Sequence, residues 1–450
     1  MGAWDWVVFV IYYVSFVAIV IGYAWTVVLF VTGGRYLRVL RERPAGSEAD
    51  YLWVFMVPAL NEGVTIADSV ERLRGVQATR KIILVINDGS DDDTGDVLAS
   101  IAGPDLEVLT RVAPDARVGK AAALNAAFEH VERTILAKPA YRDVDPSWVI
   151  FGIVDADGRL AAEAPATVAR HFDDPEVGGV QVHVHIYNQS SWLTRMQGLE
   201  FRIFGGLYQV GRSWWGTAFL GGNGQFNRMT ALRSVAGDEG PWSHYLTEDQ
   251  ELGLRCLAHG WRGEHEPDTQ VAQQGLNDLK RLYRQRGRWF QGNLQVLKDF
   301  GRLNGPRLHG IRRLDVAISL GLPILQIVVG LALVLAIVLA VFFNVAYLPW
   351  GSPLLVVFFV QLSVGPTFLG VMVVGRGQGL SGLGTTLATA LPYLLYTWLM
   401  WPVVGIGIWK QLRGSTTWAK TEREVVAPTA ACARPCIEPR CCALWQNPQP

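Results

Sequence analysis

The clearest strand in this sequence is "WVIFGIVDADG", residues 148–158. Its apolar run ends directly in a pair of aspartates, Asp155 and Asp157, followed by a glycine. A short apolar run that is closed by turn residues is typical of a buried strand. The stretch therefore predicts a core strand whose carboxyl end carries two acidic side chains.

Similar apolar runs lie on both sides of this strand, and helix-like stretches separate them. They are "YLWVFMVPAL" (51–60), "KIILVINDGS" (81–90), "DLEVLT" (105–110) and "GVQVHVHIYN" (179–188). Strands that alternate with helical patterns are typical of an α/β domain, in which a mixed, mainly parallel sheet is covered by helices on both faces. We expect one such domain over residues 51–300.

The composition indicates a soluble domain joined to a membrane part. Of the 450 residues, 50% are hydrophobic, and the mean hydropathy is positive. A chain of this length can hold both parts. The 40 basic residues balance the 40 acidic ones, so the net charge points to no nucleic-acid partner.

The amino-terminal segment has the pattern of a membrane anchor. Residues 6–34 contain no charged side chain, and this run exceeds the roughly 20 apolar residues that cross a bilayer. It is too long for the apolar region of a cleaved signal peptide. Four arginines follow it, at Arg35, Arg38, Arg41 and Arg43. By the positive-inside rule they place the 51–300 domain in the cytoplasm, with residues 1–50 as its anchor and basic linker.

A second apolar region follows the domain. From Val316 to Gly375 there are 60 residues without a charge. The turn-like stretch "NVAYLPWGSP" divides them into two predicted spans, 316–343 and 352–374. These spans form a helical hairpin through the bilayer.

A third apolar stretch, 387–409, creates a conflict between two rules. If it crosses the membrane, the carboxyl terminus lies outside, whereas the four basic residues that follow it favour the cytoplasm. A helix that lies in the interface or re-enters the membrane resolves the conflict. We therefore expect membrane and interfacial helices over 301–412, and a cytoplasmic tail over 413–450 that is disordered after residue 425. The protein is then a multi-pass protein of the cell (inner or plasma) membrane.

Acidic residues follow two of the predicted strands. Asp88 comes after the strand in "KIILVINDGS", as Asp155 and Asp157 come after the strand at 148–154. Ligands of open α/β sheets bind outside the carboxyl ends of the strands, so these carboxylates can converge there. Asp155 and Asp157 offer hard oxygens to Mg²⁺ or Mn²⁺, which can bridge diphosphate oxygens. A solvated surface pair is the alternative.

Two further motifs carry candidate chemistry. Lys120, in "VGKAAALNAAF", stands between a glycine and a helical run, where it can bind phosphate or be a solvated lysine. In "LTEDQELGLRCLAHGWR" (246–262), Thr247 suits a helix N-cap. Asp249 at the same helix start can accept a proton from a sugar hydroxyl as a general base.

The stretch "QRGRW", residues 285–289, lies shortly before the second apolar region. Gln285, Arg288 and Trp289 are related by i, i+3 and i+4, so they share one face of a helix, whereas Arg286 points elsewhere. A guanidinium can bind diphosphate bidentately, and an indole offers a flat surface to a sugar ring. An interfacial helix that binds lipid headgroups is the alternative.

The ordered motifs Asp88, Asp155-x-Asp157, Thr247-Glu248-Asp249 and Gln285-x-x-Arg288-Trp289 resemble those of family 2 inverting glycosyltransferases. The resemblance is to the membrane-embedded, processive type, such as hyaluronan, chitin and cellulose synthases, and it covers about residues 51–300. It implies a GT-A domain of the nucleotide-diphospho-sugar transferase type. The tail stretch "TTWAKTER" (416–423) also resembles a motif of bacterial members.

The resemblance also implies roles for individual residues. The uridine end of a UDP-sugar would be held by Pro58, Glu62 and Asp88, and the diphosphate by Lys120. Asp155 and Asp157 would hold the nucleotide and a divalent metal, Mg²⁺ or Mn²⁺. Asp249 would be the base, beside Glu248. The diphosphate and the acceptor sugar would be bound by Gln285, Arg286, Arg288 and Trp289.

The function that follows is a UDP-sugar-dependent hexosyltransferase, which adds sugar to a growing β-linked polysaccharide, processively and coupled to export. Its partners would be the UDP-sugar, a carbohydrate or lipid acceptor and membrane lipids, with a membrane partner or a second copy of the chain because the spans are few. One alternative is an enzyme that adds one or a few sugars to a membrane lipid. A second is a transporter or channel with a regulatory soluble domain, which the absence of charges within the spans disfavours.

Overall fold

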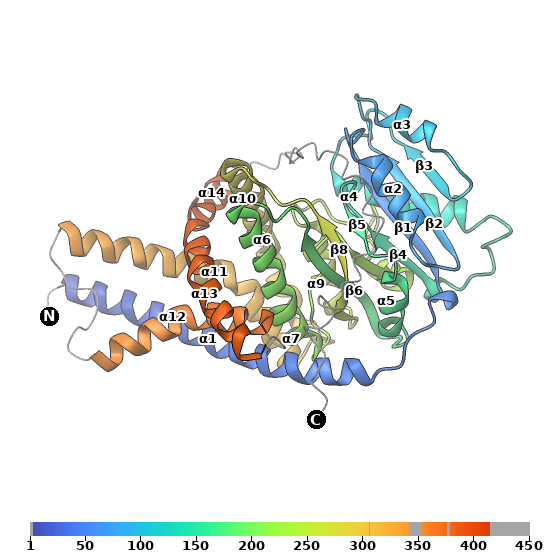
Figure 1. Ribbon diagram of the computed structural model, residues 1–450. Helices are drawn as coiled ribbons and strands as arrows, with labels where there is room; N and C mark the ends of the chain where they lie inside the picture. Colours follow the sequence, from blue (N-terminus) through green and yellow to red (C-terminus); the bar gives the residue numbers. More distant parts are fainter. Residues whose placement is uncertain (1–2, 306, 343–352, 376–378, 415–450) are drawn as a thin grey trace.

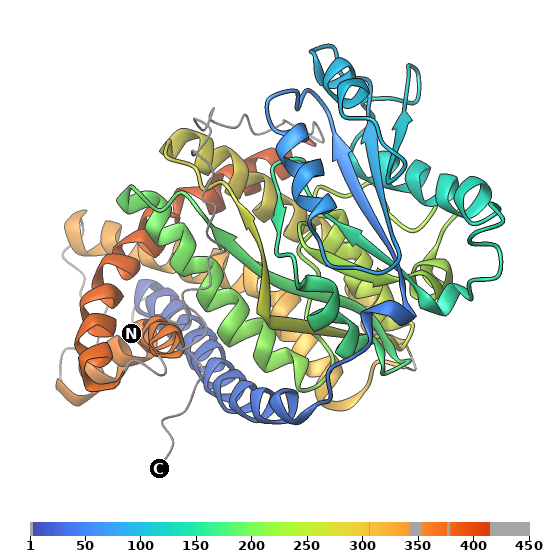
Figure 2. The same cartoon turned by 45° about the vertical axis from the view of Figure 1, so that its right-hand side comes forward.

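The computed structural model describes residues 3–305, 307–342, 353–375 and 379–414. The predicted turn "NVAYLPWGSP" lies outside the described residues except for its final proline, and so does the tail from 415, with "TTWAKTER" and its cysteines. Figures 1 and 2 show a sheet domain on one side of the molecule and a group of long helices on the other.

The domain is built on an eight-stranded sheet with the order β3-β2-β1-β4-β7-β6-β8-β5. The strands are β1 Leu52–Ala59, β2 Lys81–Asn87, β3 Leu106–Thr110, β4 Val149–Ile153, β5 Arg159–Leu160, β6 Val177–Ile186, β7 Gln225–Arg228 and β8 Arg262–Gln273. Strand β7 is antiparallel to both β4 and β6, and β5 is antiparallel to β8. The remaining neighbours pair in parallel. The prediction of a mixed, mainly parallel sheet is confirmed.

Helices cover both faces of this sheet. They are α2 Ile66–Arg74, α3 Thr94–Ser100, α4 Lys120–His130, α5 Ala164–Phe172, α8 Met229–Val235 and α9 Glu248–Ala258, with short helical turns at Glu48–Asp50, Val131–Ile135 and Pro146–Trp148. Alternate residues of β1 enter opposite cores, Phe55 on one face and Met56 on the other. Side chains of a strand alternate between its two faces, so a strand that is apolar throughout is buried on both.

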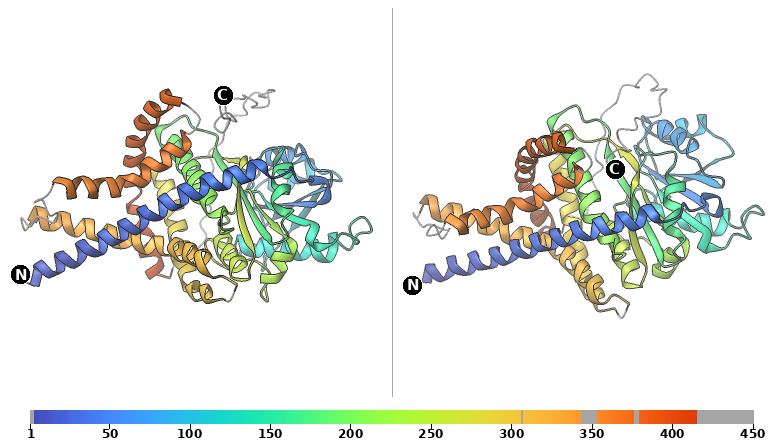
Figure 3. Two further views of the ribbon diagram at one scale, coloured as in Figure 1. Left: turned by 90° about the horizontal axis from the view of Figure 1, so that it is seen from below. Right: turned by 60° about the horizontal axis from the view of Figure 1, so that its bottom comes forward.

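The second group of helices packs beside the sheet domain. It consists of α1 Ala3–Glu42, α6 Trp192–Ile203, the π-helical turn η4 Phe204–Gln209, α7 Val210–Ser213, α10 Leu279–Val296, the 3₁₀ segment η5 Leu297–Asn304, α11 Gly310–Phe342, α12 Pro353–Val374, α13 Gly379–Leu399 and α14 Pro402–Leu412. Figures 1 and 3 show α1, α11 and α12 extending away from the sheet.

Two helical stretches among the described residues are long and apolar enough to cross a membrane, Tyr13–Glu42 and Leu387–Leu412. The first falls in the predicted anchor. The second includes the 387–409 segment, which is divided between α13 and α14 just before Pro402. Helices α11 and α12 occupy the predicted hairpin. Because two such stretches qualify by length and composition only, a multi-pass arrangement stays a proposal.

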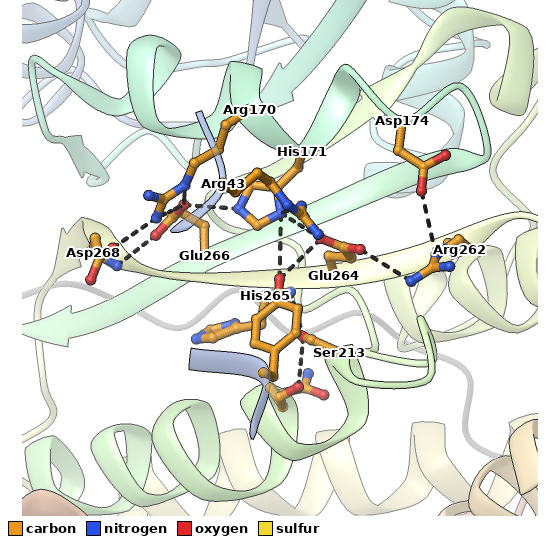
Figure 4. Close-up of polar contacts among 12 residues, drawn as sticks. Arg43, Arg170, His171, Asp174, Ser213, Arg262, Glu264, His265, Glu266 and Asp268 are labelled. Atoms are coloured by element: carbon orange, nitrogen blue, oxygen red, sulfur yellow. Dashed lines mark hydrogen bonds and ion pairs between the residues drawn. The ribbon is translucent and has the colours of Figure 1, made fainter. Parts of the chain in front are cut away.

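A buried polar cluster fastens the sheet domain together at its β8 edge (Figure 4). The His171 ring lies between two carboxylates of β8, with Nδ1 2.6 Å from Glu264 and Nε2 2.8 Å from Glu266. All three side chains are fully buried. Burial alone would lower the pKa of His171, but its hydrogen bonds to both carboxylates raise it above the ordinary value.

The same cluster binds the end of α1. The Tyr36 hydroxyl donates to Glu264 at 3.0 Å, and the Arg43 guanidinium donates to the same oxygen at 2.9 Å. On the other side, Arg170 binds Glu266 at 2.6 Å and Asp268 at 2.7 Å. The helix predicted as an anchor is therefore joined to strand β8 by buried charge-assisted hydrogen bonds.

Helix α1 also crosses α7 with direct backbone contact. A methyl group added to Gly211 would lie 2.5 Å from the Leu29 carbonyl oxygen, and one added to Gly33 would lie 3.4 Å from the Gly211 nitrogen. The Thr32 hydroxyl donates to the Gly211 carbonyl at 3.1 Å. Glycine is required on α7 at this crossing, since any side chain would separate the two helices.

Candidate active site

Asp155 and Asp157 lie in a tight turn just after β4. The Gly158 amide donates to the Asp155 carbonyl at 2.7 Å, which closes the turn. The Asp155 amide donates to the Asn223 side-chain oxygen at 3.1 Å. Both aspartates are half-buried, so the strand presents its two carboxylates at the edge of the sheet, as the sequence predicts.

Lys120 connects this turn to the start of α9. It is the first residue of α4, and its ammonium donates to Asp155 Oδ1 at 2.7 Å. The same ammonium lies 3.8 Å from Glu248 Oε1. A lysine that pairs with two carboxylates from distant segments is no longer a solvated residue at a helix start. The alternative, in which Lys120 is a solvated lysine, is therefore wrong.

The segment Thr247-Glu248-Asp249 opens α9 beside this lysine. Thr247 takes the N-cap position, although its side chain makes no capping hydrogen bond. The pKa of Glu248 is raised to about 7, mainly because the side chain is buried. The charge of Asp249 also raises this pKa, whereas the charges of Lys120 and Arg288 lower it. Burial also raises the pKa of Asp249, again against Lys120. A carboxylate with a raised pKa is a stronger base, as a general base requires.

A glycine loop between α7 and β7 closes the other side of this cluster. Gly222 has a φ of +79°, and a methyl group added to it would lie 3.0 Å from Asp249 Oδ2 and 3.6 Å from Lys120 Nζ. Gln225 accepts the Gly222 amide at 3.1 Å, and Gln181 accepts the Gly221 amide at 2.8 Å. The loop backbone is thus held against Asp249 and Lys120 by buried amide side chains.

We expect the substitution Gly222→Ala to damage both stability and turnover. A non-glycine residue in the left-handed region costs roughly 1–2 kcal/mol, so the free energy of unfolding should fall by that amount. The added methyl group also displaces Asp249, so kcat should fall by about tenfold or more. Urea unfolding and donor turnover measure the two effects.

Gly237→Ala is the matched control, since nothing lies within 4 Å of the added methyl group and φ there is not positive. This control should retain both the stability and the turnover of the unchanged protein. Equal behaviour of the two variants would show that the Gly222 loop does not constrain Asp249.

The residues predicted to hold the uridine lie one and two strands away from Asp155. Asp88 follows β2 and forms a nearly buried ion pair with Arg111. Pro58 is a half-buried residue of β1, and Glu62 accepts a hydrogen bond from the Thr65 hydroxyl at 3.0 Å. These positions share the carboxyl edge of the sheet with Asp155, and their nucleotide-binding role stays a prediction.

Helix α10 carries the four residues of the "QRGRW" motif and divides them between two sides. Gln285 is buried, and the charge of Arg288 acts on Glu248 at the start of α9. The Arg286 guanidinium donates to Glu200 of α6 at 2.7 Å and lies 4.1 Å from the centre of the Trp289 ring. Arg288 is therefore brought to the acidic cluster, whereas Arg286 is paired on the α6 side and supports Trp289. Diphosphate binding by Arg286 stays a prediction.

A divalent metal fits the two aspartates together with a substrate. Among the described residues, no three His, Cys, Asp or Glu side chains converge on one point. Mg²⁺ is commonly bound by one or two carboxylates, with water and substrate phosphates as its other ligands. Asp155 already receives a cationic group, the Lys120 ammonium. The carboxylate oxygens of Asp155 and Asp157 have the donor chemistry for such an ion, and their role as its ligands stays a prediction.

The hydrogen-bonding roles of several residues that shape this site could not be predicted from the sequence. Asn223 and Gln181 are buried polar side chains that hold the glycine loop and the Asp155 turn through hydrogen bonds. Arg111, which pairs with Asp88, is a single arginine just beyond β3 that belongs to no motif. Buried polar side chains are generally hydrogen-bonded, but their partners depend on the tertiary fold. The signal for this loop is its glycine-rich sequence, "GGNG" at 221–224, since glycine allows the backbone to come close to a ligand.

Comparison with known proteins identifies related families and folds. The model of "Glycosyl transferase family group 2" matches residues 150–404, and that of "Glycosyl transferase family 2" matches residues 54–235. The chain is 29% identical over 253 residues to beta-monoglucosyldiacylglycerol synthase of Synechocystis sp., covering 55% of this chain and 49% of that protein. It is 27% identical over 249 residues to poly-beta-1,6-N-acetyl-D-glucosamine synthase of Staphylococcus aureus, covering 55% and 56%. The match thus spans about half the length of these relatives.

A solved structure shares the fold. It is mannosyltransferase PcManGT from Pyrobaculum calidifontis in complex with GDP-Man and Mn²⁺, with a TM-score of 0.57 and 17% sequence identity, covering 89% of this chain and 99% of that one. At this identity the likeness concerns the fold alone. It agrees with the mixed, mainly parallel sheet expected of a GT-A domain.

Proposed function

This chain belongs to glycosyl transferase family group 2, and on that basis we propose that it transfers a sugar from a UDP-sugar to a growing β-linked polysaccharide. Membership makes the chain a sugar-transferring enzyme of the type that uses nucleotide-sugar donors. The alternative of a transporter with a regulatory soluble domain is therefore dropped.

One observation carries the proposed chemistry, namely that Asp249 lies beside the Lys120–Asp155 ion pair. Lys120 is 2.7 Å from Asp155, and a methyl group on Gly222 would meet both Asp249 and Lys120, so these two side chains lie close together. A nucleotide-sugar diphosphate at this ion pair puts the anomeric carbon of the sugar near Asp249. The base and the leaving-group site then face the same reacting atom, as a single displacement requires.

In the proposed reaction, Asp249 accepts the proton of the attacking acceptor hydroxyl. The hydroxyl oxygen forms a bond to the anomeric carbon as the bond from that carbon to the UDP oxygen breaks. UDP leaves with the electron pair, and an α-linked donor gives a β-glycoside. Lys120 and Arg288 stabilise the negative charge that grows on the diphosphate.

Asp155 and Asp157 would hold a divalent metal, Mg²⁺ or Mn²⁺, which supplies further positive charge to the departing diphosphate when bound. The nucleoside would lie along the carboxyl edge of β1 and β2, near Pro58, Glu62 and Asp88. The acceptor would approach from α10, where Trp289 offers an aromatic surface.

The proposed location is the cell membrane, with the sheet domain in the cytoplasm. The support is the length and apolar composition of Tyr13–Glu42 and Leu387–Leu412 and the four arginines that follow residues 6–34. The buried cluster at Glu264 would hold the catalytic domain at the end of α1.

A second candidate is the transfer of one or a few sugars to a membrane lipid. It is favoured by the 29% identity to a monoglucosyldiacylglycerol synthase, while the 27% identity to a polysaccharide synthase favours the polymer. Apolar residues of α6, α12 and α13 form one buried cluster with Leu282 of α10. Helix α10 therefore packs against the helices predicted to lie in or at the membrane.

We expect the purified protein to release UDP from one of UDP-glucose, UDP-N-acetylglucosamine or UDP-galactose in the presence of Mg²⁺ or Mn²⁺. With labelled donor, a long product that resists organic extraction supports the polymer, and an extractable product supports the glycolipid. Chelation of the metal should abolish release. Absence of UDP release from all three donors, by folded protein with acceptor present, would contradict a UDP-sugar transferase.

A further inference from the structure

One face of α10, with the following segment η5, contacts residues 245–247, which lead into Glu248 and Asp249. The Tyr245 hydroxyl donates to Asp299 Oδ2 at 2.9 Å. The Leu246 amide donates to Gln295 Oε1 at 3.1 Å. Two successive residues of the segment are thus bound by residues four positions apart along the helix.

The next two residues of the segment continue the same pattern. Thr247 packs on Gly292 so closely that a methyl group there would lie 2.5 Å from Cγ2 and 2.7 Å from Oγ1 of Thr247. Glu248 lies within the electrostatic reach of the Arg288 guanidinium. Each step along the segment therefore meets a position one turn earlier on the helix.

Positions 288, 292 and 295 of α10 are spaced by four and three residues, which places them on one face, and Asp299 follows in η5. We propose that this face sets the position of Asp249, through its contacts with residues 245–247, and that Gly292 and Gln295 are positioning residues for the transfer reaction. The inference rests on the proposed function, because it takes Asp249 to be the base.

The opposite side of α10 explains why the helix cannot move away from the segment. A methyl group on Gly287 would lie 2.8 Å from Ile406, and one on Gly407 would lie 2.6 Å from Phe290, so α14 packs closely against α10 there. A side chain added at Gly292 must therefore displace the 245–249 segment rather than the helix. Displacement of a reacting group by about 1 Å can lower the rate about 10²-fold.

The test is a double-mutant cycle of Gly292→Ala, Thr247→Ala and the combined variant. Gly292→Ala should lower kcat by about 10²-fold with little change in the donor KM. The kcat of Thr247→Ala alone is the reference against which the combined variant is compared. In the combined variant the two nearest Thr247 atoms are gone and only Cβ remains, at 3.0 Å, so most of the lost kcat should return.

The matched control is Gly301→Ala in η5, where nothing lies within 4 Å of the added methyl group. It should retain the kcat of the unchanged protein. Normal kcat in Gly292→Ala, or losses that simply multiply in the combined variant, would overturn the proposal. Absence of turnover in the unchanged protein would instead contradict the proposed function, so the two failures are distinct.

A second pair of variants keeps the test decisive if Gly292→Ala does not fold. Gln295→Glu retains an oxygen that can accept the Leu246 amide, whereas Gln295→Leu removes it. We expect Gln295→Leu to lower kcat and Gln295→Glu to restore it, with similar thermal unfolding of both. Equal kcat of the two variants would contradict a positioning role for Gln295.

Discussion

The variant Asp249→Asn should lose about 10²–10⁴-fold in kcat, which is the usual contribution of a general base. Asparagine has almost the same shape and can still accept the Gln250 amide, which donates to Asp249 Oδ1 at 2.8 Å. It cannot accept the proton of the attacking hydroxyl. The measurement is the rate of UDP release at saturating donor and acceptor.

A change of charge alone is controlled by Asp143→Asn. The Asp143 side chain is 88% exposed and lies outside the site, so this variant should turn over normally. The turnover of Glu248→Gln gives a further comparison, because the Lys120 ammonium lies near both Glu248 and Asp155. If Asp249→Asn releases UDP as fast as the unchanged protein, Asp249 is not the general base and another group accepts the proton.

The second large effect concerns stability at the β8 edge. His171→Leu should lower the free energy of unfolding by about 3 kcal/mol, because removal of one partner from a buried ion pair costs about 3–5 kcal/mol. The effect falls at the lower end because Arg43 and Arg170 still pair with Glu264 and Glu266. Urea unfolding of the purified protein, followed by tryptophan fluorescence, measures the loss.

An exposed ion pair provides the comparison. Arg133 pairs with Glu129 at 2.7 Å, and both side chains are largely exposed. Arg133→Leu should change stability by less than about 0.5 kcal/mol. If His171→Leu and Arg133→Leu have the same small effect, the buried cluster does not hold the domain together.

The pH dependence of this cluster follows from two pKa shifts. The pKa of His171 is raised above 6.5, so its contribution is complete below that value and is lost as pH rises through the raised pKa. Burial would raise the pKa of Glu264, but His171 and Arg43 lower it from 4.5 to about 2. Its contribution is present above 4.5 and is lost as pH falls towards 2. The cluster therefore stabilises the fold most between pH 4.5 and 6.5. In His171→Leu, the free energy of unfolding should no longer fall as pH rises through the raised pKa of His171.

Sequence patterns predicted the five strands that contain an apolar or alternating run, β1 to β4 and β6, and missed β5, β7 and β8. Strand β4 and its two aspartates were evident because an apolar run ends abruptly in turn residues. Strand β8 was not, because its sequence "RGEHEPDTQVAQ" reads as a polar loop. Its buried glutamates become acceptable only beside His171 and Arg170, which lie some ninety residues earlier. The four residues of β7, "QFNR", lie between β4 and β6 in the sheet, and they too contain no pattern that predicts a strand.

The candidate site shows the same division. The start of α9 and the helical positions of Gln285, Arg288 and Trp289 follow from local spacing alone, but in the structure Trp289 lies with Arg286 on the α6 side. Local spacing does not tell which element a helix face meets. Neither the pairing of Arg286 with Glu200 nor the reach of Lys120 to Asp155 could be predicted, because each joins segments that only the tertiary fold brings together.

The crossing at Gly211 has a consequence for how a product could grow. The carbonyl of Leu29 lies against the backbone of α7, and Arg43 is held by Glu264 of the sheet domain, so the first helix is fixed to the rest of the molecule at two points. On the proposed function, the catalytic domain then keeps a fixed position relative to the first helix while the product grows. After each addition the sugar chain itself has to slide forward by one unit, so that its new end returns to Asp249.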